Sequence, residues 1–107
     1  MSGRRVRLCA AEDVAPGQAR RCDVDGHRIA LVRIDDDFYA IGDTCSHADV
    51  SLSEGEVLRS DRELECWKHG STFSLLTGEP SCLPAVAAVP VYRVSVVNDD
   101  VVVELDA

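Results

Sequence analysis

The fold is indicated most directly by the stretch Val91-Tyr92-Arg93-Val94-Ser95-Val96-Val97, which is followed by Asn98-Asp99-Asp100 and then by Val101-Val102-Val103-Glu104-Leu105. Two runs rich in β-branched residues flank a polar segment, and this pattern is typical of a β-hairpin. The same pattern recurs earlier in the chain, where residues 27–34 and 38–41 flank three aspartates. Both stretches therefore predict antiparallel strand pairs.

The remaining segments also favour strands over helices. Val6 to Ala10 predicts a first strand at an edge, and Asp25-Gly26 predicts a tight hairpin turn. A short helical turn can start near Ala11, but Pro16-Gly17 ends it. We therefore expect an all-β, antiparallel sandwich or barrel that forms one domain over residues 1–107.

The middle of the chain differs from its two ends. Between residues 42 and about 84, glycines and prolines are frequent and the predicted strands are short. Such a composition indicates loops that bend sharply. We expect a small, loop-rich subdomain here, organised around something other than a hydrophobic core.

Composition excludes several classes of function. The chain has 107 residues, of which 46% are apolar, and 19 acidic against 11 basic residues give a net charge of −8. This charge repels phosphate backbones and anionic lipids, so we expect no binding to nucleic acid or membranes. No apolar run approaches the ~20 residues of a membrane-spanning helix, and no export signal is recognised. A cytoplasmic location is therefore expected.

The residues that carry chemistry form two pairs. The first pair is Cys45-Ser46-His47 and the second is Cys66-Trp67-Lys68-His69, with 18 residues between His47 and Cys66. An extended stretch precedes each pair, at 38–41 and at 63–65, so each pair is expected on a loop at the end of a strand. The intervening residues suffice for a short hairpin that brings the two loops together. Two thiolates and two imidazoles would then face one point.

Two kinds of metal centre use two sulfur and two nitrogen ligands: tetrahedral zinc and a [2Fe–2S] cluster with mixed ligation. Structural zinc sites usually pair like with like within one loop, whereas each loop here supplies one cysteine and one histidine. This arrangement favours the binuclear cluster. A structural zinc module remains an alternative at this stage.

The two motifs together resemble the Rieske iron–sulfur family. The resemblance extends to Ser71, Phe73 and Thr77-Gly78 after the second motif, and to the β-runs on either side. It implies that Cys45 and Cys66 bind one iron as thiolates. It also implies that His47 and His69 bind the other iron through ring nitrogens, and that electrons leave through these imidazoles.

Three positions depart from the respiratory and photosynthetic members of that family. Val50 and Lys68 stand where those proteins carry a disulfide, and Phe73 stands where they carry a tyrosine hydroxyl near a cysteine sulfur. Fewer hydrogen bonds to sulfur destabilise the reduced cluster. We therefore expect a reduction potential in the lower part of the Rieske range of roughly −150 to +300 mV.

The resemblance implies a soluble ferredoxin of a bacterial aromatic-ring dioxygenase system. Such a protein is an electron carrier and not an enzyme. Its expected partners are a flavin-dependent NAD(P)H reductase and a Rieske non-haem iron oxygenase. Alternatives are an accessory protein of iron–sulfur assembly and the small subunit of a nitrite reductase.

Other candidate residues have simpler interpretations. Cys9, Cys22 and Cys82 each stand without a neighbouring histidine and are expected to be packing or surface thiols. Trp67 lies between two candidate ligands. We interpret it as a hydrophobic lid over the cluster, and the alternative is a contact with a partner protein.

Overall fold

The computed structural model describes residues 4–44, 50–67, 71–80 and 87–105, and its regular structure is mainly β-strand. The strands and the two short 3₁₀ turns, η1 and η2, follow in chain order: β1 (Arg4–Ala10), η1 (Ala11–Asp13), β2 (Ala19–Val24), β3 (His27–Ile34), β4 (Asp37–Gly42), η2 (Leu52–Glu54), β5 (Val57–Leu58), β6 (Glu63–Glu65), β7 (Thr72–Ser74), β8 (Val91–Val97) and β9 (Asp100–Leu105). The expected all-β class is confirmed.

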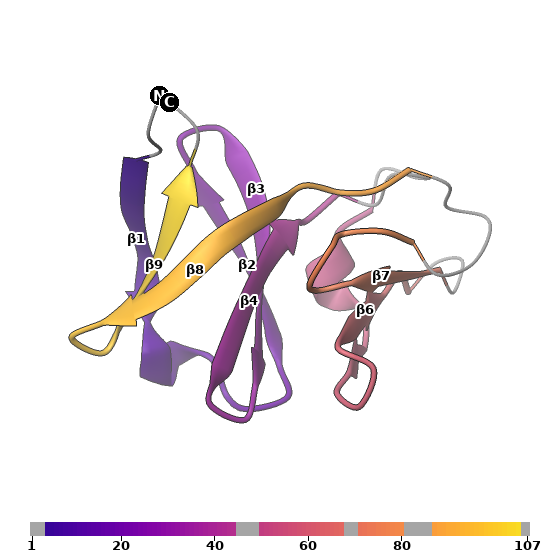
Figure 1. Cartoon of the computed structure of the whole chain (residues 1–107), viewed down its shortest axis with the longest axis horizontal. Helices are drawn as coiled ribbons and strands as arrows, with labels where there is room; N and C mark the ends of the chain where they lie inside the picture. The colour runs from indigo at the N-terminus through magenta and orange to yellow at the C-terminus, as the bar shows by residue number, and fades with distance from the viewer. Residues whose placement is uncertain (1–3, 45–49, 68–70, 81–86, 106–107) are drawn as a thin grey trace.

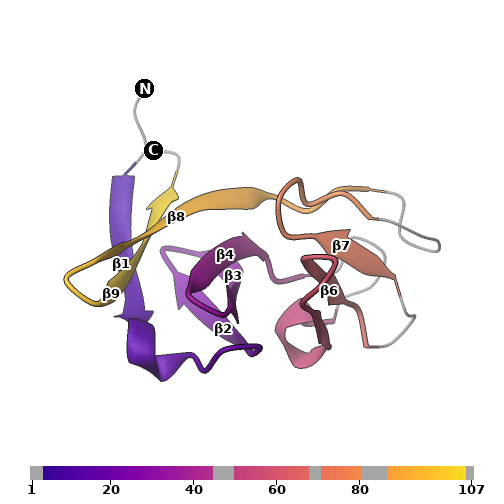
Figure 2. The ribbon, with the colours of Figure 1, turned by 60° about the horizontal axis from the view of Figure 1, so that its bottom comes forward.

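The described strands form two antiparallel sheets. The larger sheet has six strands in the order β1-β9-β8-β4-β3-β2, and the smaller sheet has three in the order β5-β6-β7. Figure 1 shows the two sheets side by side, with the long strand β8 running from the small sheet across the large one. Figure 2 shows the same division from another direction. The small sheet falls inside the loop-rich segment expected over about 42–84.

The hairpins predicted from sequence are present, with turns that suit the twist of antiparallel strands. Asp25 and Gly26 have φ values of 49° and 81°, and Asn98 and Asp99 have φ values of 51° and 66°. Two consecutive residues with positive φ form the type I′ turn, which glycine, asparagine and aspartate tolerate best. Asp100, expected in the second turn, instead pairs with Val97 at the start of β9.

Strand β3 lies between two hydrophobic cores and is buried on both faces. Ile29 and Leu31 face the core enclosed by the large sheet. Ala30, Val32 and Ile34 face the core between the large and the small sheet. Burial on both faces explains why residues 29–32 are continuously apolar instead of alternating.

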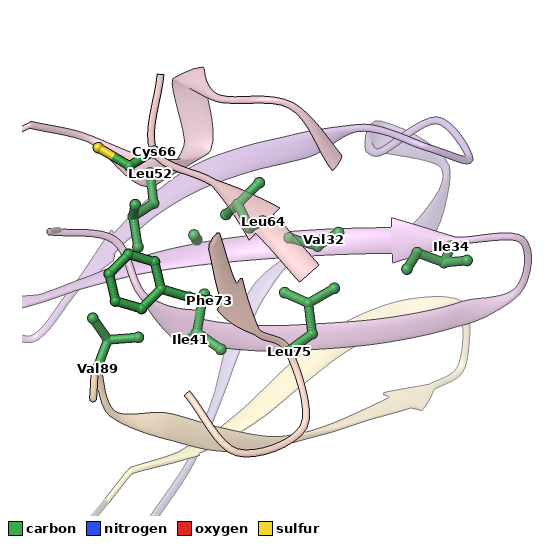
Figure 3. Packing of buried hydrophobic residues seen from close by; sticks show 10 residues of the cluster. Val32, Ile34, Ile41, Leu52, Leu64, Cys66, Phe73, Leu75 and Val89 are labelled. Atoms are coloured by element: carbon green, nitrogen blue, oxygen red, sulfur yellow. The ribbon is translucent and has the colours of Figure 1, made fainter. Parts of the chain in front are cut away.

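The core between the sheets positions the segments of the candidate site. Leu52, Leu64, Cys66 and Phe73 from the small-sheet side are each 0% exposed and pack with Ile41 of β4. Figure 3 shows these side chains gathered between the ribbons of the two sheets. Because η2, β6 and β7 each contribute a side chain to this core, the small sheet packs directly against β4.

None of the described residues belongs to a helix that has the length and the apolar character needed to cross a bilayer.

Cys22 in β2 makes the stability of the fold sensitive to alkaline pH. Burial raises the pKa of its thiol from 9.0 to about 11. In the unfolded chain the thiol ionises near pH 9, whereas the folded protein keeps it protonated. This stabilisation is therefore complete below pH 9 and is lost as the pH rises from 9 to 11. Urea titrations of the wild type between pH 8 and 11 should show this loss.

The matched variant is Cys22→Ala, which removes the ionising group. We expect the difference in unfolding free energy between wild type and variant to shrink as the pH rises through this window. A difference that stays constant from pH 8 to 11 would contradict the assignment to Cys22.

Candidate metal centre

The segment that carries the first predicted ligand pair begins where β4 ends. After Gly42 the chain continues through Asp43 to Thr44, which forms an antiparallel bridge with Ser51. Leu52 N–H also donates to the carbonyl oxygen of Asp43 at 2.6 Å. These contacts hold the two ends of the intervening segment together. Cys45 and His47 themselves lie outside the described residues.

The segment that carries the second pair begins where β6 ends. Cys66 follows Glu65 directly, and its N–H donates to the carbonyl oxygen of Ser71 at 2.6 Å. β7 then starts at Thr72, opposite Glu65 in the β6–β7 ladder. Lys68 and His69 lie outside the described residues. Each candidate ligand segment thus leaves and re-enters the fold at a point where its two ends are hydrogen-bonded or bridged.

The described flanks of the two segments line a common groove. Thr44, Val50 and Ser51 flank the first segment, and Trp67 belongs to the second; all four line one groove of about 310 Å³. The side chains of Leu52 and Cys66 also belong to the same core. The described flanks of the two predicted ligand loops therefore lie beside each other.

Cys66 is suited to bind a soft metal. Its side chain is 0% exposed, and in Figure 3 its sulfur points away from the neighbouring labelled side chains. A thiolate that is shielded from water is a ligand that iron accepts. Phe73, also fully buried in this core, presents only a ring with no hydroxyl group.

The exposure of Trp67 bears on its interpretation. Its side chain is 53% exposed, although it directly follows the fully buried Cys66. A large aromatic surface left in water next to a cluster is typical of a contact with a partner protein. The exposure supports the partner-contact interpretation, and the lid interpretation stays a prediction.

Asp43 is a residue of the site that the sequence did not reveal. Its carboxylate is almost fully buried. It accepts hydrogen bonds from Ser51 Oγ at 2.5 Å and from Ser53 N–H at 2.9 Å. The Nε atom of Arg21 lies 3.9 Å from the same carboxylate. Asp43 therefore links the end of β4 to the start of η2 by hydrogen bonds. In the sequence alone, it looks like an ordinary solvent-exposed aspartate near a turn.

Removing this carboxylate should destabilise both the fold and the first ligand segment. Asp43→Ala leaves the part-buried N–H of Ser53 and the hydroxyl of Ser51 without their carboxylate acceptor, so we expect a loss of about 3 kcal/mol in unfolding free energy. Asp43→Asn retains an amide oxygen and should cost about 1 kcal/mol. Urea unfolding and iron content per chain measure the two effects. Asp23→Ala is the control, because Asp23 contacts the same Arg21 but is exposed, and it should change neither quantity.

Comparisons with known proteins agree with this geometry. Residues 4–93 match the family model of the Rieske [2Fe-2S] domain. The chain is 41% identical over 101 residues to the 3-phenylpropionate/cinnamic acid dioxygenase ferredoxin subunit of Escherichia coli (strain K12), covering 94% of this chain and 93% of that protein.

Solved structures show the same likeness. The ferredoxin of carbazole 1,9a-dioxygenase from Nocardioides aromaticivorans IC177 superposes with a TM-score of 0.90 at 34% identity, covering 96% of this chain and 98% of that one. A ferredoxin chain in a complex of reduced oxygenase and oxidized ferredoxin of carbazole 1,9a-dioxygenase superposes with a TM-score of 0.85 at 39% identity, covering 95% and 94%. The chain therefore belongs to the Rieske [2Fe-2S] family, and within it to the ferredoxins that carry electrons by means of one such cluster.

Proposed function

We propose that this ferredoxin receives single electrons from a flavin-dependent NAD(P)H reductase and delivers them to a Rieske non-haem iron oxygenase that acts on an aromatic ring. The similarity to dioxygenase ferredoxins at 34–41% identity over nearly the whole chain supports this role. One of these relatives was solved in complex with its oxygenase. Delivery in the cytoplasm is part of the proposal.

We further propose the ligand set. Cys45 and Cys66 bind one iron through sulfur, and His47 and His69 bind the other through nitrogen. The set belongs to a single domain over residues 1–107, with a cluster-binding subdomain over about 42–84. Family membership decides between a cluster and zinc in favour of the cluster.

The observation that carries the proposal is the shared groove between the flanks of the two motifs. Thr44 and Val50 line it from one side and Trp67 from the other, so the described flanks of both predicted ligand pairs share this groove, which supports the proposed ligand set. The cluster supplies reversible one-electron chemistry at this place. The surrounding core is a rigid support, because Leu52, Leu64 and Phe73 are fully buried. Close-packed side chains of this kind rearrange little when the cluster gains one electron.

The test uses the purified protein with its cluster. We expect two irons and two sulfides per chain and visible absorption that bleaches when NADH and a flavin reductase of an aromatic-ring dioxygenase system are added. Adding an oxidised Rieske oxygenase component under anaerobic conditions should restore the absorption. The same reductase without NADH is the control.

Two results would contradict the proposal. Bleaching by dithionite together with failure to re-oxidise on any of several dioxygenase oxygenase components would remove the oxygenase from the pathway. Re-oxidation by the catalytic subunit of a nitrite reductase instead would favour that alternative, which has a structural counterpart named a putative nitrite reductase small subunit at 26% identity.

Trp67→Ala tests the proposed partner contact. Aromatic residues at the centre of an interface frequently contribute about 2 kcal/mol or more to binding, so we expect the concentration of ferredoxin that half-saturates the oxygenase to rise roughly thirtyfold or more. Stopped-flow re-oxidation at varied ferredoxin concentration measures this value. Leu76→Ala is the matched control, because Leu76 is 62% exposed and has no part in the groove. Equal effects of the two substitutions would argue against a contact at Trp67.

A further inference from the structure

Two cysteines outside the metal centre lie against each other inside the large sheet. Cys9 of β1 is 3% exposed and Cys22 of β2 is 8% exposed. Both belong to the core enclosed by the large sheet, whereas Cys66 belongs to the core between the sheets. The two thiols are near enough for each to influence the pKa of the other. Neither has a role in holding the cluster.

The position of the pair in the sheet is unusual. β1 and β2 are the two end strands of the six-stranded order. They approach each other because the sheet curls, yet no β-ladder joins them among the strand pairs that the structure describes. Among the described strands, the two thiols therefore lie at the seam where β1 and β2 approach each other without a β-ladder between them. Figure 2 shows β1 and β2 on the same side of the molecule, joined by the chain through η1.

A β-bulge turns Cys9 toward this seam. Arg7 pairs with Val102 and Cys9 with Val101, so Leu8 is an extra residue relative to β9. An extra residue reverses the direction of the side chains that follow it. Without the bulge, Cys9 would lie on the outer face of β1, away from Cys22.

The seam is open enough for a small molecule to approach. Arg7, Leu8, Arg20 and Cys22 line a groove of about 260 Å³ between the two strands. Burial raises the pKa of both thiols, and the positive charge of Arg20 partly offsets this effect. Because the thiolate is the reactive form, the pair reacts slowly near neutral pH. It would therefore respond to prolonged exposure to an oxidant and not to brief exposure.

We propose that Cys9 and Cys22 are a site of oxidative modification, at which hydrogen peroxide converts the two thiols into a disulfide that closes the β1–β2 seam. Cys22 attacks one peroxide oxygen; the O–O bond breaks, water leaves and Cys22 becomes a sulfenic acid. Cys9 then attacks the Cys22 sulfur; the S–S bond forms, the S–O bond breaks and a second water leaves. In sum, two thiols lose two electrons and two protons, and one peroxide is reduced to two waters.

The cross-link should stabilise the fold. It ties residues 9 and 22 and so closes a loop of about 13 residues, which restricts the unfolded chain. Cys9 lies on β1 and Cys22 on β2, the two end strands of the large sheet. With the disulfide in place, unfolding can no longer start by separation of these strands. We expect the midpoint of thermal unfolding to rise by roughly 10 °C.

The test treats the protein, with its cluster bound, with hydrogen peroxide and then blocks the remaining thiols with iodoacetamide. Trypsin places Cys9 in peptide 8–20 and Cys22 in peptide 22–28, each with one cysteine. We expect mass spectrometry to detect these two peptides as one disulfide-linked species. The same treatment in 8 M urea should give mixed pairings among all the cysteines. Cys82→Ser should form the linked species as the wild type does.

Three results would overturn the proposal. The first is that Cys9 and Cys22 are both found alkylated by iodoacetamide although peroxide has oxidised other thiols of the folded protein. The second is that the Cys9–Cys22 linkage makes up no larger a share of all disulfides in the folded protein than in urea. The third is a thermal midpoint that is the same before and after the oxidised protein is treated with dithiothreitol. In Cys9→Ser and Cys22→Ser, neither the linkage nor the shift in midpoint should occur.

Discussion

Cys66→Ser is expected to lower the visible absorption of the purified protein below about a tenth of that of the wild type, because the cluster loses a thiolate that serine cannot replace. Cys66 is the proposed ligand whose surroundings the structure describes. It follows β6 directly, is fully buried, and is held by a backbone hydrogen bond to Ser71. The substitution changes one atom and leaves this support in place. Iron content and the visible spectrum measure the loss.

The control for this prediction is Cys22→Ser, which makes the same chemical change in the other core. It should keep the full iron content and visible spectrum. Far-UV circular dichroism should show strand content for both variants. A Cys66→Ser protein that retains wild-type absorption would contradict the proposed ligand set.

Gly55→Ala, between η2 and β5, should strongly destabilise the fold. A Cβ atom at Gly55 would lie 1.7 Å from the carbonyl oxygen of Glu65, the residue before Cys66. Backbone cannot yield as a flexible side chain does, so β6 must move away from η2. We expect a loss of more than about 3 kcal/mol in unfolding free energy. Because the displaced carbonyl adjoins Cys66, iron retention should fall in parallel.

Gly26→Ala separates this steric effect from the general cost of replacing glycine. Gly26 has a φ of +81° and no atom within 4 Å of an added Cβ. Alanine there should lower the unfolding free energy by about 1 kcal/mol through backbone strain and leave the iron content unchanged. Urea unfolding and iron analysis of both variants give the comparison. Equal losses at the two positions would mean that the approach of Glu65 to Gly55 does not support the cluster segment.

The strands that could be predicted are those determined by neighbouring residues. The hairpins 27–42 and 91–105 combine β-branched runs with turns such as Asp25-Gly26, and every part of that signal lies within a few residues. The short turn at Ala11 was expected for the same reason. β5 and β7 were not predicted, since they have two and three residues and exist only because both pair with β6.

The candidate site divides in the same way. The residue types and spacing of Cys45, His47, Cys66 and His69 indicate the metal chemistry without any structure. Asp43 could not be predicted, because its importance depends on Ser51 and Ser53, which reach it only after the chain has turned back. The exposure of Trp67 likewise depends on what the fold leaves uncovered.

The amino-acid sequence alone thus indicated the long hairpins, the tight turns and the donor atoms of the proposed cluster ligands. These properties arise from steric preferences and donor atoms that each residue carries with it. The folded chain decided which distant segments meet: the Asp43 carboxylate with η2, Gly55 with the end of β6, and Cys9 with Cys22 across the unpaired seam. Such meetings depend on how a twisted sheet curls and on how two cores fill, which are properties of the whole packed chain and of no single segment.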